Sequence, residues 1–90
     1  GLDSAGLVFL ALSLAGIAAP RFADLQATAL GREVVGWTAM LRGDLLFYQD
    51  HAAIVVDERS AIHVDGGAVT RTAISAIVGY GPLVARRRLP

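Results

Sequence analysis

Two histidines are the residues whose type and surroundings most readily support chemistry. His51 and His63 each have an acidic neighbour, and each lies in a short run rich in β-branched residues. A hairpin of residues 52–56 and 61–65 would bring both imidazoles to the same end of a sheet. There one ring can take a proton while the other fixes its tautomer. The same spacing is also compatible with two unrelated histidines on an ordinary hairpin.

Ser4 is a third candidate, because it stands where a helix is expected to begin. A nucleophile at a helix N-terminus lies near the positive end of the macrodipole, which stabilises an anion. This effect lowers the pKa of a thiol usefully, whereas a serine hydroxyl needs a strong base beside it. The alternative is that Ser4 serves only as an N-cap.

A metal site is the remaining possibility for these side chains. Both histidines with one of Asp3, Asp50 or Asp65 could bind zinc, which accepts two imidazoles and a carboxylate. No helical spacing or local ligand cluster favours this, and the absence of Cys excludes thiolate zinc sites and disulfides. We therefore predict no metal and no cofactor.

Length and charge set the limits of the function. Ninety residues correspond to one domain, residues 1–90. The eight basic residues, all Arg, balance eight acidic ones, which argues against a nucleic-acid partner. The apolar fraction of 54% favours a folded core over disorder.

Two helices are expected in the N-terminal third. The first begins at Asp3 or Ser4 and runs toward Pro20, buried on most sides. Its acidic start and modest length do not match a signal peptide or a membrane span, so we expect no membrane insertion. The second covers residues 21–31, with Gly31 at its C-terminal end. The predicted inner stripes are Leu7, Leu10, Leu14 and Ile17 in the first helix, and Phe22, Leu25, Ala29 and Leu30 in the second.

Short strands are expected in the rest of the chain. After a strand at Glu33–Val35, the runs lie at residues 44–49, 52–58, 60–65, 68–73 and 83–89, separated by turn residues. Segment 74–82 is either a turn of helix or a loop. Arg86–Arg88 is expected on an edge strand, where charge blocks further pairing. Helices followed by such strands predict an α+β fold, with N-terminal helices packed on an antiparallel sheet.

Three segments together resemble a known family. They are GLDSAGLVFLALSLAGIAAPRFADLQ, RGDLLFYQDHAAIVVDERSAIHVD and the closing VARRRL. The chain from Asp3 to Leu89 resembles the NlpC-type papain-like cysteine peptidases, which cut the stem peptides of bacterial peptidoglycan. The resemblance implies a papain-like fold, peptidoglycan stem peptides as partners, and a secreted, periplasmic or cell-wall location.

The resemblance also implies roles for individual residues. Ser4 falls at the position of the nucleophilic Cys, His51 at that of the general base, and His63 at that of the third catalytic residue, which orients the base. Asp3 and Ala5 flank the nucleophile position and are candidate substrate-binding residues. Asp3 also matches a family motif position that is expected to be structural, as do Gly6, Gly43 and Asp44.

Two departures from the family pattern shape the expected function. Serine replaces the nucleophilic Cys. The sequence also begins almost at that position, without the family's upstream segment, and we expect another segment or chain to supply that part. Three interpretations of Ser4 remain: a substitution that inactivates the enzyme, a natural non-catalytic module that binds peptidoglycan or a protein partner, and a Ser-His-His hydrolase. We expect the first, an inactive form of a peptidoglycan peptide hydrolase.

Overall fold

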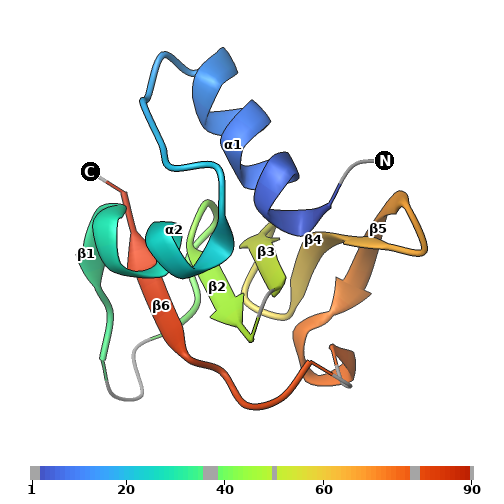
Figure 1. Ribbon diagram of the computed structural model, residues 1–90. Helices are drawn as coiled ribbons and strands as arrows, with labels where there is room; N and C mark the ends of the chain where they lie inside the picture. Colours follow the sequence, from blue (N-terminus) through green and yellow to red (C-terminus); the bar gives the residue numbers. More distant parts are fainter. Residues whose placement is uncertain (1–2, 36–38, 50, 78–79, 90) are drawn as a thin grey trace.

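The chain folds as two helices packed on one face of a sheet (Figure 1). The computed structural model describes residues 3–35, 39–49, 51–77 and 80–89. Its six strands form a sheet in the order β1-β6-β2-β3-β4-β5, and each neighbouring pair is antiparallel. The predicted α+β architecture is confirmed. The elements are α1 (Ser4–Leu14), α2 (Ala23–Ala29), β1 (Arg32–Glu33), β2 (Leu45–Tyr48), β3 (His51–Val55), β4 (Ser60–Asp65), β5 (Ala68–Ala73), the 3₁₀ turn η1 (Ile74–Ala76) and β6 (Ala85–Arg88).

Helix α1 begins where the sequence predicts and ends earlier. The Asp3 side chain caps it by accepting the Gly6 N–H at 2.6 Å, a bond that lowers the pKa of Asp3 together with one from Arg21. The helix ends at Leu14 because Gly16 takes a left-handed conformation with φ of +78°. The expectation that it continues toward Pro20 is therefore wrong.

The buried face of α1 also differs from the expectation. The helix contacts β3, β4 and α2 through Ala5, Val8 and Leu12, which are all nearly inaccessible. These residues form a stripe of small and medium side chains, so the N-terminal end of the helix lies close to the sheet. The predicted stripe and the expected burial on most sides are wrong, because side chains on the outer face are half-buried to exposed, as in Leu7, Leu10, Leu14 and Ile17.

Helix α2 is held by a buried polar side chain in addition to part of its predicted apolar stripe. Phe22 and Ala29 are exposed, Leu30 is buried, and the side chain of Leu25 lies outside the described residues. Gln26 is fully buried, and its Nε2 donates to the carbonyls of Ala5 at 3.0 Å and Pro20 at 2.7 Å. This amide therefore joins α2 to the first turn of α1.

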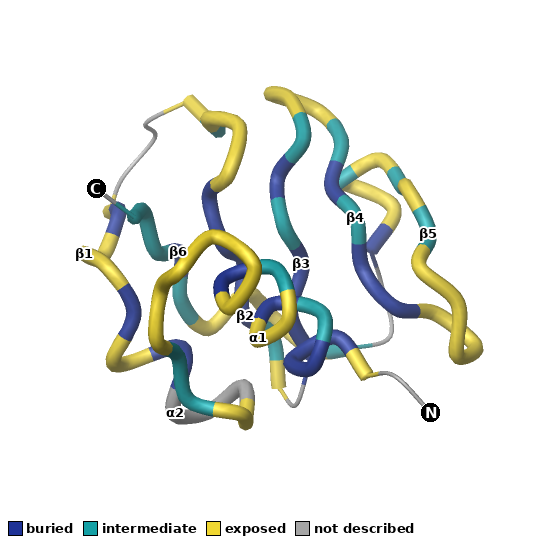
Figure 2. The backbone as a smooth tube through the Cα atoms, turned by 90° about the horizontal axis from the view of Figure 1, so that it is seen from above, coloured by how far each residue is buried: buried dark blue, intermediate teal, exposed yellow. Residues whose placement is uncertain are grey.

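The sheet buries side chains on both of its faces. Leu45, Phe47 and Ala52 pack under the helices, whereas Leu46 and Ala53 pack in a second cluster on the opposite face. Figure 2 shows β3 and β4 largely buried, while much of β5 is exposed. Strands β3 and β4 therefore provide a buried and well-packed platform at the centre of the molecule.

Strand β6 lies inside the sheet, so the prediction of an edge strand for the arginine run is wrong. Its neighbours are β1 and β2, and its alternating side chains find partners on both faces. Arg87 donates to the carbonyls of Leu30 and Gly31 behind α2. On the other face, Arg86 and Arg88 bind the carboxylate of Asp44 at 2.7–3.0 Å. The three arginines that were expected to keep the strand at an edge thus all have hydrogen-bond partners inside the fold, and Asp44 offsets part of their charge.

Asp44, Arg86 and Arg88 are called the arginine cluster below. The Asp44 carboxylate is 1% exposed and also accepts the Leu41 N–H at 3.1 Å. Burial alone would raise the pKa of Asp44, but the hydrogen bonds from Arg88, Leu41 and Arg86 lower it to about 2. Asp44 is therefore ionised at neutral pH, and it joins the start of β2 to β6.

Candidate functional site

Ser4 and His51 meet where the first turn of α1 approaches the start of β3. The Ser4 Oγ lies 3.1 Å from Nδ1 of His51, and both residues are buried, at 4% and 5% exposed. The Asp3 cap fixes the first turn, and β3 begins at His51 itself. A hydroxyl and an imidazole at this distance form the pair that a nucleophile and its base require.

The second histidine continues the same line of polar groups. His51 Nε2 lies 2.9 Å from His63 Nδ1, and His63 Nε2 lies 3.1 Å from the hydroxyl of Thr72 on β5. The prediction that the β3–β4 hairpin brings the two histidines together is confirmed. Ser4, His51, His63 and Thr72 are called the histidine network below.

The Ser4 hydroxyl has further partners on β4. The Val64 N–H donates to Oγ at 3.0 Å, and the Val64 carbonyl lies 3.4 Å from the same atom. The hydroxyl proton thus has two acceptors within reach, the carbonyl of β4 and Nδ1 of His51. These contacts join α1 to β4 in addition to placing Oγ beside the imidazole.

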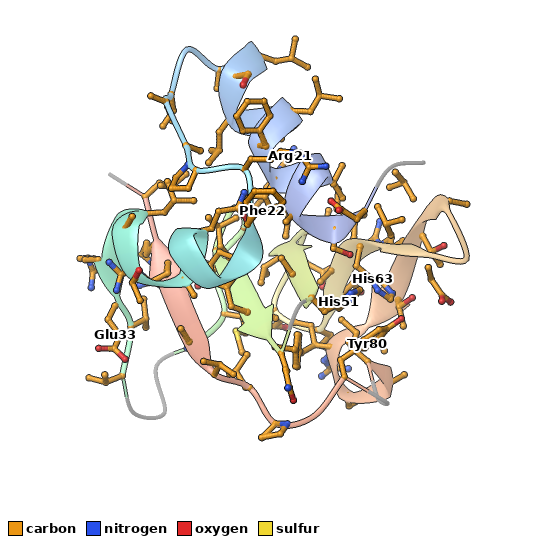
Figure 3. All side chains as sticks on the ribbon, viewed as in Figure 1. Arg21, Phe22, Glu33, His51, His63 and Tyr80 are labelled. Atoms are coloured by element: carbon orange, nitrogen blue, oxygen red, sulfur yellow. The ribbon has the colours of Figure 1, made fainter. Side chains whose placement is uncertain are left out.

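Tyr80 covers one face of the base. Its ring stacks on His51 with centroids 3.6 Å apart and planes 3° apart, and Figure 3 shows Tyr80 near both histidine side chains. Burial, followed by the proximity of His63, lowers the pKa of His51 below 6.5, although Asp65 opposes this shift. His51 is therefore neutral at pH 7 and can accept a proton, the state that a general base requires.

A comparison with protein-family models identifies the family of the chain. The model of the NlpC/P60 family matches residues 1–85. The chain belongs to the NlpC/P60 family. This membership indicates cell-wall peptidase activity, and members generally act on peptidoglycan peptides outside the cytoplasm. No curated protein matches the chain significantly. Within the described residues, no helix is long and apolar enough to cross a bilayer.

The two candidate substrate-binding residues of this NlpC/P60 chain differ in exposure: Asp3 is exposed and Ala5 is buried. Asp3 is exposed beside the nucleophile position, where its carboxylate binds Gly6 and Arg21. Ala5 lies on the buried face of α1 and packs in the core between the helix and the sheet. Their role in substrate binding stays a prediction. Among the described residues, no group of three or more His, Cys, Asp or Glu side chains is placed to hold a metal ion.

Sequence reasoning missed Thr72 and Tyr80. The two-residue turn Gly66–Gly67 joins β4 to β5 and pairs His63 with Thr70, which leaves Thr72 as the diagonal neighbour on the same face. This register could have indicated Thr72 from the sequence. Tyr80 lies within segment 74–82, which the sequence left ambiguous, and no periodicity there predicts its stacking on His51.

Proposed function

We propose that this NlpC/P60 chain carries the site of a peptidoglycan peptide hydrolase in which serine occupies the place of the nucleophilic Cys. The observation that carries the proposal is the continuous contact from Ser4 Oγ through His51 to His63. The substrate is an amide bond of the peptidoglycan stem peptide. The bond between D-γ-glutamyl and diaminopimelyl residues is the first to test, since the family commonly cuts it.

With a thiol at position 4, the site has the parts of a Cys-His-His mechanism. His51 Nδ1 takes the thiol proton, and the resulting imidazolium donates from Nε2 to His63 Nδ1. The thiolate then attacks the amide carbon, and the leaving amine receives the proton from His51. Water hydrolyses the acyl-enzyme with His51 again acting as base.

The first turn of α1 provides donors for the developing oxyanion. The N–H groups of Gly6 and Leu7 already bind Asp3. Those of Ser4 and Ala5 have no partner within the described part of the chain. They lie at the positive end of the helix next to the nucleophile, so we assign them to the oxyanion.

The serine hydroxyl accounts for the expected lack of turnover. A thiol becomes a thiolate beside an imidazole at neutral pH, whereas a hydroxyl has a far higher pKa and keeps its proton. In this chain the Val64 carbonyl also competes with His51 for that proton. The proposal is therefore that the unmodified chain binds stem peptides and cleaves them slowly or not at all.

Ser4→Cys tests the proposal. The variant is expected to cleave muropeptides in a reaction that iodoacetamide abolishes, because the new thiol adjoins Nδ1 of His51. Fragment release is followed by liquid chromatography and mass spectrometry. The alkylation rate of the thiol in Ser4→Cys should stay high below pH 7, since the imidazolium of His51 stabilises the thiolate.

Ser13→Cys is the matched control, because Ser13 is an exposed residue of the same helix. Its thiol should react with iodoacetamide as an ordinary surface thiol and should cleave nothing. If the thiols of Ser4→Cys and Ser13→Cys show the same pH dependence of alkylation and neither variant cleaves muropeptides, the hydrolase proposal is wrong.

A non-catalytic binding module is the second candidate, and the double contact of Ser4 with Val64 favours it. A hydroxyl that joins α1 to β4 has a structural use that needs no chemistry. Muropeptide titration followed by NMR separates the two functions. Binding by the unmodified chain that persists in Ser4→Cys without any cleavage would support the module.

A further inference from the structure

The histidine network extends one residue beyond the three positions of the proposed mechanism. Thr72 lies on β5, and its hydroxyl is 3.1 Å from Nε2 of His63. Strand register places it there, because Thr72 pairs with Ala61, two residues before His63 on the adjacent strand. Thr72 is partly buried, and so is its contact with His63. The network thus ends on a hydroxyl, which can accept and donate.

The order of donors along the network has only two self-consistent forms while both imidazoles are neutral. In the forward form, Ser4 donates to His51, His51 Nε2–H donates to His63, and His63 Nε2–H donates to Thr72. In the reverse form Thr72 donates to His63 Nε2, His63 Nδ1–H donates to His51 Nε2, and His51 Nδ1–H donates to Ser4. Nδ1 of His51 then carries the proton. Only the forward form leaves Nδ1 free to act as a base toward position 4.

The reverse form requires a less favourable contact at the other end of the network. In that form the Ser4 proton is directed to the Val64 carbonyl at 3.4 Å, which is longer than the 3.1 Å to His51. The forward form needs an acceptor for His63 Nε2–H, and the Thr72 hydroxyl provides it. Without that hydroxyl, the forward form leaves an unpaired N–H at a partly buried position, whereas the reverse form leaves only an unpaired lone pair. Unpaired donors are the rarer of the two in buried sites.

We propose that Thr72 is a positioning residue that holds the histidine network in its forward form by accepting the proton of His63 Nε2. The same bond supports the imidazolium of His51, because His63 Nδ1 accepts from it only while the His63 proton sits on Nε2. The catalytic significance of this role rests on the proposed function. The tautomer itself does not, because it is a property of the unmodified chain.

Nitrogen-15 NMR of the imidazole rings in the unmodified chain measures the tautomers directly. At pH 7.5, His63 is expected to be protonated on Nε2 and unprotonated on Nδ1. Thr72→Val removes the hydroxyl and keeps the shape, and it should shift His63 toward the Nδ1–H form. Thr72→Ser should restore the signature. Thr70→Val is the matched control, since Thr70 lies on the same face and bonds to the Ala68 carbonyl instead.

The kinetic readout uses the same substitutions together with Ser4→Cys. Thr72→Val is expected to lower kcat on the order of tenfold with KM unchanged, as for groups that orient a working imidazole through a second hydrogen bond. Thr72→Ser should recover most of the rate, and Thr70→Val should change it less than twofold.

Two outcomes would overturn the proposal: an Nδ1–H tautomer of His63 in the unmodified chain, or the same His63 tautomer in Thr72→Val as in Thr70→Val. If Thr72→Val does not give the spectrum of a folded chain, Thr72→Ala replaces it with the same expectations. A tautomer shift in Thr72→Val, with no cleavage by Ser4→Cys, would retain the positioning role and reject the hydrolase. The two failures are thus distinguishable.

Discussion

Two buried polar clusters lie at opposite ends of the β2–β3 hairpin, and they differ in charge. The histidine network adjoins the end where Tyr48 pairs with His51, while the arginine cluster adjoins the start of β2 at Leu45. The first is built from imidazoles and hydroxyls, and the lowered pKa of His51 keeps that ring neutral at pH 7. The second contains one carboxylate and two guanidinium groups, which stay charged over the whole physiological range.

Under the proposed function, the arginine cluster stabilises the sheet and the histidine network transfers a proton. A permanently ionised cluster suits a structural link between β2 and β6, since its ion pairs persist near neutral pH. A network of imidazoles and hydroxyls in which the pKa of His51 is lowered suits proton transfer, because its members can exchange donor and acceptor roles. One end of the β2–β3 hairpin therefore carries paired charges, and the other carries hydrogen-bonded imidazoles and hydroxyls.

The largest expected effect comes from removing the charge of the arginine cluster. Asp44→Asn leaves two guanidinium groups without their buried counter-charge, and we expect a loss of about 3–5 kcal/mol in the free energy of unfolding. Urea denaturation followed by circular dichroism measures it. Asp57→Asn is the control, because Asp57 pairs with Arg71 at the surface. Equal shifts of the urea midpoint in Asp44→Asn and Asp57→Asn would show that the arginine cluster contributes no more to stability than a surface ion pair.

The pH dependence of stability should differ between the two clusters. The pKa of His51 is lowered from 6.5, so below pH 6.5 the unfolded chain binds a proton that the folded chain excludes, and stability falls. For Asp44, stability is lost only as pH falls from 3.8 toward about 2. His51→Gln should therefore flatten the free energy of unfolding between pH 7.5 and 5.5 and leave the loss below pH 3.8. Urea unfolding at each pH measures this free energy. If its slope against pH between 7.5 and 5.5 is the same in His51→Gln as in the unmodified chain, the assignment of this loss to His51 is wrong.

The smallest expected effect concerns the stacking of Tyr80 on His51. Tyr80→Ala should raise the pKa of His51 toward 6.5 by exposing the ring, and should cost about 1 kcal/mol of stability. Tyr80→Phe keeps the ring and should change neither quantity appreciably. Histidine NMR titration and thermal unfolding measure the two. A pKa of His51 that is the same in Tyr80→Ala and Tyr80→Phe would show that the ring does not control solvation of the base.

Local signals in the sequence were enough to predict the element types and the pairing of the histidines. Turn residues between the runs set the β3–β4 hairpin, and the hairpin by itself brings His51 to His63. The start of α1 follows in the same way from Asp3, whose cap lies within a single turn. Each of these features depends on residues close together in the chain or joined by one short connection.

What the sequence could not predict depends on contacts between distant segments. Apolar side chains surround α1, so periodicity alone could not show that the stripe containing Ala5 and Val8 faces the sheet. The arginine run suggested an exposed edge because its partner, Asp44, lies more than forty positions earlier. Tyr80 reaches His51 from a segment without a regular pattern.

The separation between Asp44 and its partners has a consequence for the order of folding during synthesis. Arg86 and Arg88 leave the ribosome 42 and 44 residues after Asp44, so for that interval the carboxylate must remain hydrated. Strand β2 and the loop before it cannot close over an unpaired charge. The β3–β4–β5 side, with the histidine network beside it, can therefore form first, and β6 completes the sheet last. A nascent chain lacking β6 would present an unpaired edge of β2, the state most open to chaperone binding and to misassembly.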